Sequence, residues 1–417
     1  MAEIGWIDFS VNDRKKMKQA MSLIRPEGQL DELGMGRIRD GIANLLFPGL
    51  STIHTRAKYF FIVPYIFRDF LYLPLKEKNK ITAARYLEER QHEVKNNLRA
   101  KYEGQSNTGI IGITLSEKQK SVRQPAEIYW VGINTFECLN AGGLSMSALL
   151  KNIQHIDFGA ASQSNTEELD DDRDAGIDIN HNIRIPAAPR NWKETIDIKL
   201  TQLEADFLEN AFSDVHNPTL QNSVLQRVFH HNGLMQCLLN AKNFAEFAKV
   251  AYNLPNIENE LRQNLILAHD FAYIIDGAHI IYNHLLQLHF FPKEYEGEHL
   301  TAWALWYENL PAALIDFNGF QIQDLNDWIS DARYFVSNWW EMVNKQVPYK
   351  QLNMDAMFSL IRNRELSVKG RKARLHNSIQ SYYEMQPMKW IGLRPLQYRF
   401  ANAKRIIEDI KNPIQDA

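Results

Sequence analysis

Cysteine is scarce in this sequence. The 417 residues include two cysteines, Cys138 and Cys237, and neither stands in a CxxC pair. So low a count excludes a disulfide framework and a cysteine-based zinc site. It is also typical of proteins that fold in a reducing cytosol.

A leader sequence and a long apolar run are missing as well. The first ten residues contain no basic stretch followed by an apolar core, so they do not predict a signal peptide. The closest candidate for a membrane span, residues 59–66, is too short and contains Pro64. We therefore expect a cytoplasmic protein with no membrane partner.

The familiar catalytic motifs are absent. The sequence contains no GxxxxGK[ST] phosphate loop, no GxGxxG after a strand, no GxSxG elbow, no HExxH zinc motif and no HxK pair in a phospholipase D-type context. Because an active site of a new kind would escape these patterns, their absence makes an enzyme less expected without excluding one. We predict no cofactor, no metal site and no catalytic residues.

What the sequence does contain is segregated charge. The net charge is −3, yet residues 1–100 hold 17 Lys and Arg against 12 Asp and Glu, a balance of +5. Residues 101–350 hold 18 against 32, a balance of −14, and residues 351–417 hold 12 against 6, a balance of +6. Basic ends favour a polyanionic partner such as DNA. The acidic middle could dock a partner protein or cover the basic ends.

Apolar residues at helical spacing, punctuated by prolines, predict a mainly α, multi-helix protein. We divide it into a basic helical subdomain at 1–103, a small mixed region at 104–156, an acidic loop or linker at 157–191, and a helical domain with a basic end at 192–417. In the mixed region glycines interrupt two short runs, 110–114 and 128–131, which could be strands or the starts of buried helices.

The N-terminal subdomain has helix-turn-helix proportions. We expect helices over 11–24 and 37–47, and a third helix from Ser51 or Thr52 until Pro64 kinks or ends it. The side chains that could meet phosphates there are Arg37, Arg39, Arg56 and Lys58. Residues two apart lie roughly 200° around a helix, so neither basic pair shares a face. A packed subdomain with ordinary surface arginines is therefore the favoured alternative.

The strongest local signal is a basic stretch near the C-terminus. It comprises Arg362, Arg364, Lys369, Arg371, Lys372 and Arg374. Only Glu365 opposes these charges, and Gly370 suggests a turn whose N–H groups could face an anion. With Tyr382, Tyr383 and Trp390 nearby, the pattern suits a nucleic-acid backbone. A solvated linker, or a docking surface for the acidic middle of the chain, would produce the same pattern.

A third candidate combines a carboxylate with imidazoles. Asp276 and His279 are i,i+3 neighbours on an expected helix, and His269 falls on the same side. Such a face could bind a metal or act as an acid–base pair. Its flanks are apolar and no second ligand helix is evident, so we favour a core Asp–His hydrogen bond.

Several segments resemble a bacterial family of unknown function. They are residues 4–10, 31–34 with Gly36, Ile38, Arg39 and Asp40, then 47–49, 51–53, 55–60, 127–130 and 396–400. The resemblance covers most of the chain. It implies an accessory subunit of an antiphage defence system, encoded beside helicase and phospholipase D-like nuclease genes, and it supplies no catalytic residues.

The charge pattern and the resemblance together predict a non-catalytic subunit that binds DNA, a helicase or nuclease partner, or both. An unrecognised nuclease-like enzyme centred on Asp276 and His279 is one alternative. A structural scaffold that binds protein but no nucleic acid is the other.

Overall fold

The structure, a computed structural model, is built from helices. It describes residues 31–156, 183–310, 330–345, 347–376, 387–393 and 396–414. Within those ranges it contains α-helices and two short 3-10 helices, and it has no strand beyond an isolated bridge between Leu139 and Ile183. The predicted mainly α fold is confirmed. The helix expected over 11–24 lies outside the described residues.

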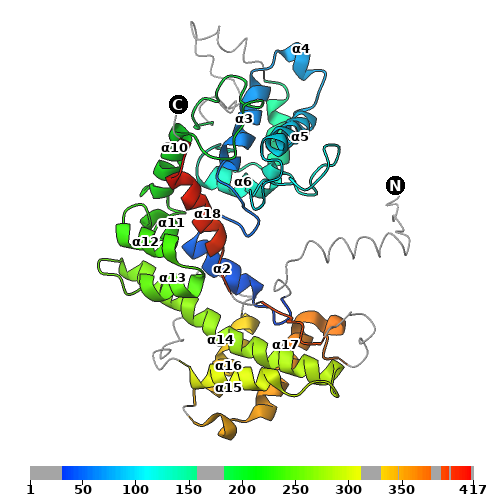
Figure 1. Ribbon diagram of the computed structural model, residues 1–417, viewed down its shortest axis with the longest axis vertical. Helices are drawn as coiled ribbons and strands as arrows, with labels where there is room; N and C mark the ends of the chain where they lie inside the picture. The colour runs from blue at the N-terminus through cyan, green and yellow to red at the C-terminus, as the bar shows by residue number, and fades with distance from the viewer. Residues whose placement is uncertain are drawn as a thin grey trace, which may run out of the picture. The chain divides into compact units, whose positions relative to one another are not determined.

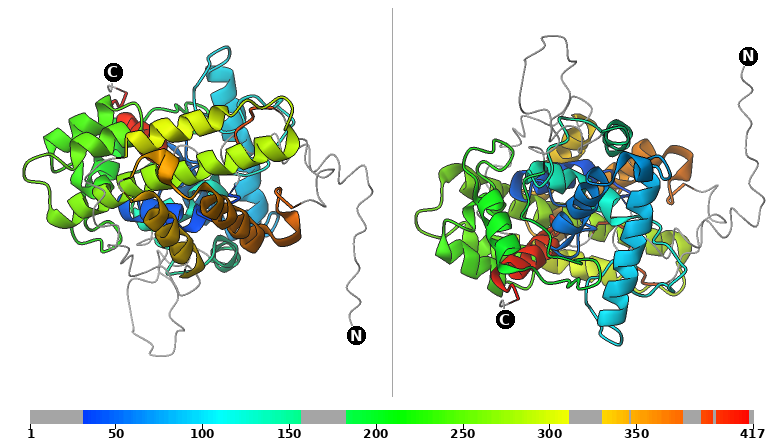
Figure 2. Two further views of the ribbon diagram at one scale, coloured as in Figure 1. Left: turned by 90° about the horizontal axis from the view of Figure 1, so that it is seen from below. Right: turned by 90° about the horizontal axis from the view of Figure 1, so that it is seen from above.

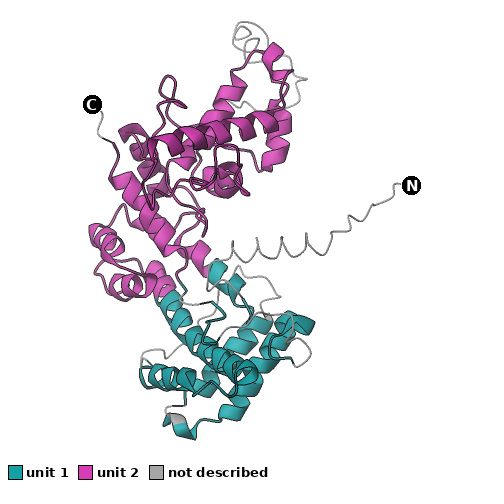
Figure 3. Ribbon diagram, turned by 45° about the vertical axis from the view of Figure 1, so that its right-hand side comes forward, with its two compact units in different colours: residues 1–41, 266–396 teal, residues 42–265, 397–417 magenta. Residues whose placement is uncertain are grey.

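The chain forms two compact units, each assembled from separated stretches of sequence (Figure 3). Unit 1 comprises Met1–Gly41 and Ile266–Leu396, and unit 2 comprises Ile42–Leu265 and Gln397–Ala417. The boundary expected after residue 103 falls inside unit 2, because helices on both sides of it pack on one central helix. The C-terminal domain expected at 192–417 is shared between the two units.

Unit 2 is organised around one apolar helix, α3 (Tyr59–Leu71), in which eleven of the 13 residues are buried. The other helices of this unit are α4 (Leu75–Lys78), α5 (Ala83–Lys101), α6 (Pro125–Thr135), α7 (Met146–Ile153), α10 (Gln202–Ser213), α11 (Val224–Arg227), α12 (Asn232–Asn240), α13 (Phe244–Ala251) and α18 (Phe400–Lys411). Helices α5 and α6 pack on α3, while α18 lies against α10 and α12 (Figures 1 and 2).

Helix α3 begins later than the sequence predicts. The chain before it is a loop, and the helix starts at Tyr59 with Pro64 inside it. The backbone N–H groups of Thr55 and Arg56 donate to the hydroxyl of Tyr129 on α6, at 2.8 and 3.0 Å. The Tyr129 hydroxyl thus accepts hydrogen bonds from backbone N–H groups that a helix would otherwise pair. These two residues can therefore stay in a loop without leaving buried donors unpaired.

The region with the two candidate strands contains neither. Residues 128–131 belong to helix α6, where Pro125 occupies the first turn and the Glu127 carboxylate accepts the Gln124 N–H at 3.2 Å. Both features are typical of helix N-termini. Residues 111–114 form turns, and Gly109 and Gly112 have φ of 73° and 75°, which favours glycine.

Unit 1 has a tryptophan-rich core. Its helices are α15 (Glu298–Glu308), α16 (Ser330–Val343) and α17 (Met354–Lys369), with most of α14 (Asn259–Phe290) and the first half of α2 (Gly36–Leu46). The indole N–H groups of Trp306 and Trp339 donate to carbonyls of α14, each at 3.0 Å. Gly277 on α14 makes room for Trp306, because a Cβ there would lie 2.4 Å from the indole ring.

Helix α14 is long and apolar enough, by length and composition, to cross a membrane. It is the one such helix in the described ranges, and 61% of its most apolar window is buried inside the protein. Its buried residues include Phe271, Ile274 and Ile275, each 0% exposed. A buried core helix has the same length and composition, so these properties fit α14 as a core helix equally well.

Candidate nucleic-acid interface

The C-terminal basic stretch folds as the end of helix α17. Asn353 caps its start by accepting the Ala356 N–H at 3.1 Å. The helix buries Met357, Ile361 and Glu365 along one stripe. It ends at Gly370, whose φ of 53° lies in the left-handed region. A short 3-10 turn, η4 (Gly370–Lys372), follows.

Three basic side chains of this stretch are exposed: Arg362, Arg371 and Lys372. We call them the α17 basic end. Arg362 and the half-buried Lys369 are seven residues apart, which places them on one face about 10 Å apart along the helix axis. A basic residue in the last turn of a helix also interacts favourably with the helix dipole, and this interaction stabilises the helix by roughly 0.3–1 kcal/mol.

Arg374 and Lys369 are bound by a buried carboxylate. Glu32, 4% exposed, accepts from Arg374 Nε at 3.0 Å and from Lys369 Nζ at 2.9 Å. Arg374 itself is 8% exposed. Its guanidinium therefore holds residues near position 32 against the end of α17, and it lies below the surface that a nucleic acid would touch.

Glu365, expected to oppose the basic stretch, is fully buried and organises the turn after α17. Its carboxylate accepts from the backbone N–H groups of Arg374 and Leu375, at 2.7 and 3.0 Å, and from the Tyr282 hydroxyl at 2.7 Å. Burial raises the pKa of Glu365, and burial beside this carboxylate raises the pKa of Tyr282. The negative charge in the basic stretch is thus turned inward.

The Arg364 side chain makes its contacts within unit 1. Its Nε donates to the carbonyl of Leu33 at 2.8 Å, and its guanidinium lies 5.6 Å from the ring centroid of Phe335. Burial lowers the pKa of Arg364. Of the six basic residues predicted to bind nucleic acid in this stretch, the structure therefore leaves Arg362, Arg371 and Lys372 on the surface.

In unit 2, Arg56 forms a partly buried ion pair and Lys58 forms a buried one. Arg56 Nε lies 3.0 and 2.9 Å from the two carboxylate oxygens of Asp409 on α18, and the same carboxylate accepts the Ala57 N–H at 2.9 Å. Lys58 Nζ lies 2.7 and 2.6 Å from the carboxylate oxygens of Glu204 on α10. These contacts join the loop before α3 to two distant helices, so both cations serve the fold.

The two remaining N-terminal candidates lie on α2. Arg37 is exposed, and Arg39 is half-buried with its guanidinium 2.8 Å from the Asp40 carboxylate. The helix begins where Asp31 accepts the N–H groups of Met35 and Gly36, at 2.6 and 2.8 Å. As the sequence predicts, Arg37 and Arg39 do not share a helix face.

Among the described residues, the structure brings no further metal ligands to the Asp276–His279 pair. His279 is fully buried, its Nδ1 lies 2.9 Å from the Ile275 carbonyl, and Gly392 packs against its ring. Among the residues that the structure describes, no group of three or more His, Cys, Asp or Glu side chains could hold a metal ion.

Comparison with protein families gives a match over nearly the whole chain. The model of a family described as "Family of unknown function (DUF6361)" matches residues 1–406. Searches of curated proteins and of solved structures found no significant match.

Proposed function

The chain belongs to the DUF6361 family of unknown function, and from this premise we propose that it is a non-catalytic subunit that binds nucleic-acid phosphates through the α17 basic end. One observation carries the proposal. Arg362, Arg371 and Lys372 are exposed within eleven residues, while the neighbouring acidic side chains, Glu32 and Glu365, are buried. These two carboxylates therefore do not add negative charge to the surface that carries the three cations.

Phosphate contact is the interaction that such a surface supports best. Arginine and lysine neutralise backbone phosphates without reading sequence, and they release condensed counterions as they do so. Arg362 lies in the second half of α17, and Arg371 and Lys372 lie in the turn after it, so a single backbone strand could meet all three cations. The proposed binding is therefore independent of base sequence.

The biological setting is part of the same proposal. The resemblance to proteins of antiphage defence loci supports an accessory role beside a helicase or a phospholipase D-like nuclease. In that role the subunit would hold DNA for a catalytic partner. A catalytic constellation of its own would not be required.

Salt dependence of DNA binding tests the proposal. Three phosphate contacts predict a slope of log K against log salt of about −2 to −3, or a roughly 20- to 40-fold loss of affinity between about 50 and 200 mM salt. The double variant Arg371→Gln/Lys372→Gln should reduce the slope to about −1. Fluorescence anisotropy with a labelled oligonucleotide, single- and double-stranded, measures both.

The matched control carries the same loss of charge elsewhere. Lys80→Gln/Arg85→Gln removes two exposed cations of unit 2 that pair with Glu77 and Glu89. This control should keep the wild-type slope. Equal slopes in all three proteins, or no binding of the wild type at low salt, would refute direct contact through the α17 basic end.

A further inference from the structure

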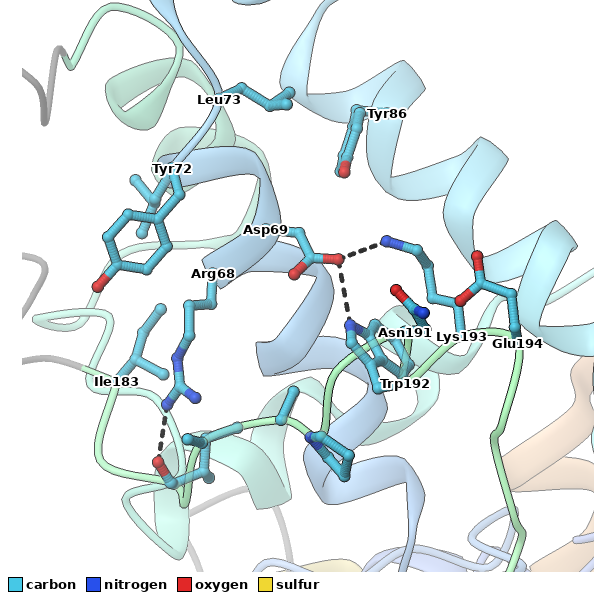
Figure 4. Close-up of a pocket in the computed structure, with 15 residues that line it drawn as sticks. Arg68, Asp69, Tyr72, Leu73, Tyr86, Ile183, Asn191, Trp192, Lys193 and Glu194 are labelled. Carbon is cyan, nitrogen blue, oxygen red and sulfur yellow. Dashed lines mark hydrogen bonds and ion pairs between the residues drawn. The ribbon is translucent and has the colours of Figure 1, made fainter.

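Unit 2 contains a cavity of about 860 Å³ that none of the sequence motifs indicates. Its walls come from the end of α3, the start of α5 and the segment 183–194 (Figure 4). Sites for small molecules have roughly 300–1,000 Å³ and combine aromatic side chains with a few placed polar groups. This cavity has both, as the following contacts show.

Arg68 supplies a charge that no described carboxylate balances by an ion pair. Its two terminal nitrogens donate to the carbonyls of Pro186 and Ile185, at 2.8 and 2.7 Å. These bonds use two of the five N–H donors and hold the guanidinium plane against the cavity wall. Burial lowers the pKa of Arg68, so the half-buried cation would gain from an anionic partner.

The other charges of the inner wall are matched. Asp69 accepts from Lys193 Nζ at 2.7 Å and from Trp192 Nε1 at 3.2 Å, as Figure 4 shows. Glu194 lines the same cavity from an exposed position. The four charged side chains that line the cavity therefore sum to zero, with Glu194 exposed and Arg68 half-buried.

Aromatic rings supply part of the apolar wall. Tyr86 is half-buried and braced by Phe70, with ring centroids 5.3 Å apart. Trp192 is 6% exposed, and its indole is fixed by the bond to Asp69. A planar ring beside them would gain stacking contacts, which favour offset or tilted geometry.

We propose that this cavity binds a small organic anion that carries a planar ring, with its oxyanion on Arg68 and its ring against Tyr86. The proposal is independent of the nucleic-acid contact at the α17 basic end, which belongs to unit 1. A phosphate or a carboxylate meets the same guanidinium fork. A nucleoside monophosphate has the required parts and serves as the probe.

Binding of adenosine monophosphate to the full chain tests the assignment. Titration calorimetry should give a dissociation constant of about 1 mM or lower. Adenosine lacks the anion and ribose 5-phosphate lacks the ring, so each should bind at least about tenfold more weakly. Arg68→Gln should lower the affinity for the monophosphate about ten- to a hundredfold, because a charged hydrogen bond is removed. Arg85→Gln, an exposed arginine at the start of α5, should leave it unchanged.

A wild-type readout keeps the test independent of variant folding. With ¹⁹F-labelled tryptophan, the Trp192 resonance is assigned from its loss in Trp192→Phe, and the monophosphate should shift it. Absence of binding by all three compounds, or binding that neither shifts Trp192 nor weakens in Arg68→Gln, would overturn the proposal. Binding of a short oligonucleotide without binding of the monophosphate would also overturn it.

Discussion

Replacing Lys58 by methionine should destabilise unit 2 without changing DNA affinity. The Lys58 side chain is 5% exposed and its partner Glu204 is 1% exposed. Removing the ammonium leaves a buried carboxylate that keeps the Tyr65 hydroxyl at 3.1 Å and the Thr201 N–H at 2.8 Å. Both remaining donors are neutral, so the negative charge of Glu204 loses its counter-charge.

The magnitude follows from the burial of the pair. Breaking a buried ion pair by removing one partner costs about 3–5 kcal/mol, mainly because the other charge stays desolvated. In a unit of this size 1 kcal/mol corresponds to roughly 2–4 °C, so the melting temperature of Lys58→Met should fall by roughly 6–20 °C. A phosphate-binding lysine on the surface would show a change within about 0.5 kcal/mol.

Chemical denaturation followed by tryptophan fluorescence provides the assay, and a double-mutant cycle with Glu204→Gln provides the control. Since the two side chains touch, the loss in Lys58→Met/Glu204→Gln should be smaller than the sum of the single losses. A loss below about 1 kcal/mol for Lys58→Met, or additive losses in the cycle, would refute the assigned role. So would weaker DNA binding by a folded Lys58→Met protein.

Three further changes follow from buried contacts. Burial lowers the pKa of His54 from 6.5 to about 4. The free energy of unfolding should therefore be highest above pH 6.5 and fall by up to about 3 kcal/mol as the pH drops towards 4. In denaturation experiments across this pH range, His54→Gln should reduce that fall. Gly277→Ala should cost about 1–3 kcal/mol in thermal unfolding because the methyl group displaces Trp306. Arg374→Met should cost about 3 kcal/mol in the same assay, because it removes one of the two cations that pair with the buried Glu32 among the described residues.

The helical class could be predicted from the sequence because apolar spacing is a local signal. Helix α17 illustrates this, since its apolar buried residues Met357 and Ile361 and its glycine end are visible in the sequence, whereas the burial of Glu365 is not. The start of α3 could not be predicted, because the acceptor for the N–H groups of Thr55 and Arg56 is a tyrosine 74 and 73 residues further along the chain. This long-range hydrogen bonding outweighs the local helical preference of the residues before Tyr59.

The candidate site shows the same limit. Arg374 and Lys372 are two residues apart and chemically alike in the sequence, yet one is buried and the other exposed. The difference arises from Glu32, which lies 342 positions before Arg374. The cavity escaped the sequence for the same reason, because Lys193 is 124 positions from Asp69. The only local indication was a charged pair, Arg68 and Asp69, near the end of an otherwise apolar helix.

Lysine footprinting on the wild-type protein tests the central claim most directly, because it maps the DNA contact without any substitution. Lys372 in the α17 basic end and Lys118 in unit 2 are both exposed, so an amine-reactive acetylating reagent should modify both in the free protein. Bound DNA should protect Lys372 and leave Lys118 as reactive as before, with protection lost as salt is raised. Equal modification of Lys372 with and without saturating DNA would contradict the account.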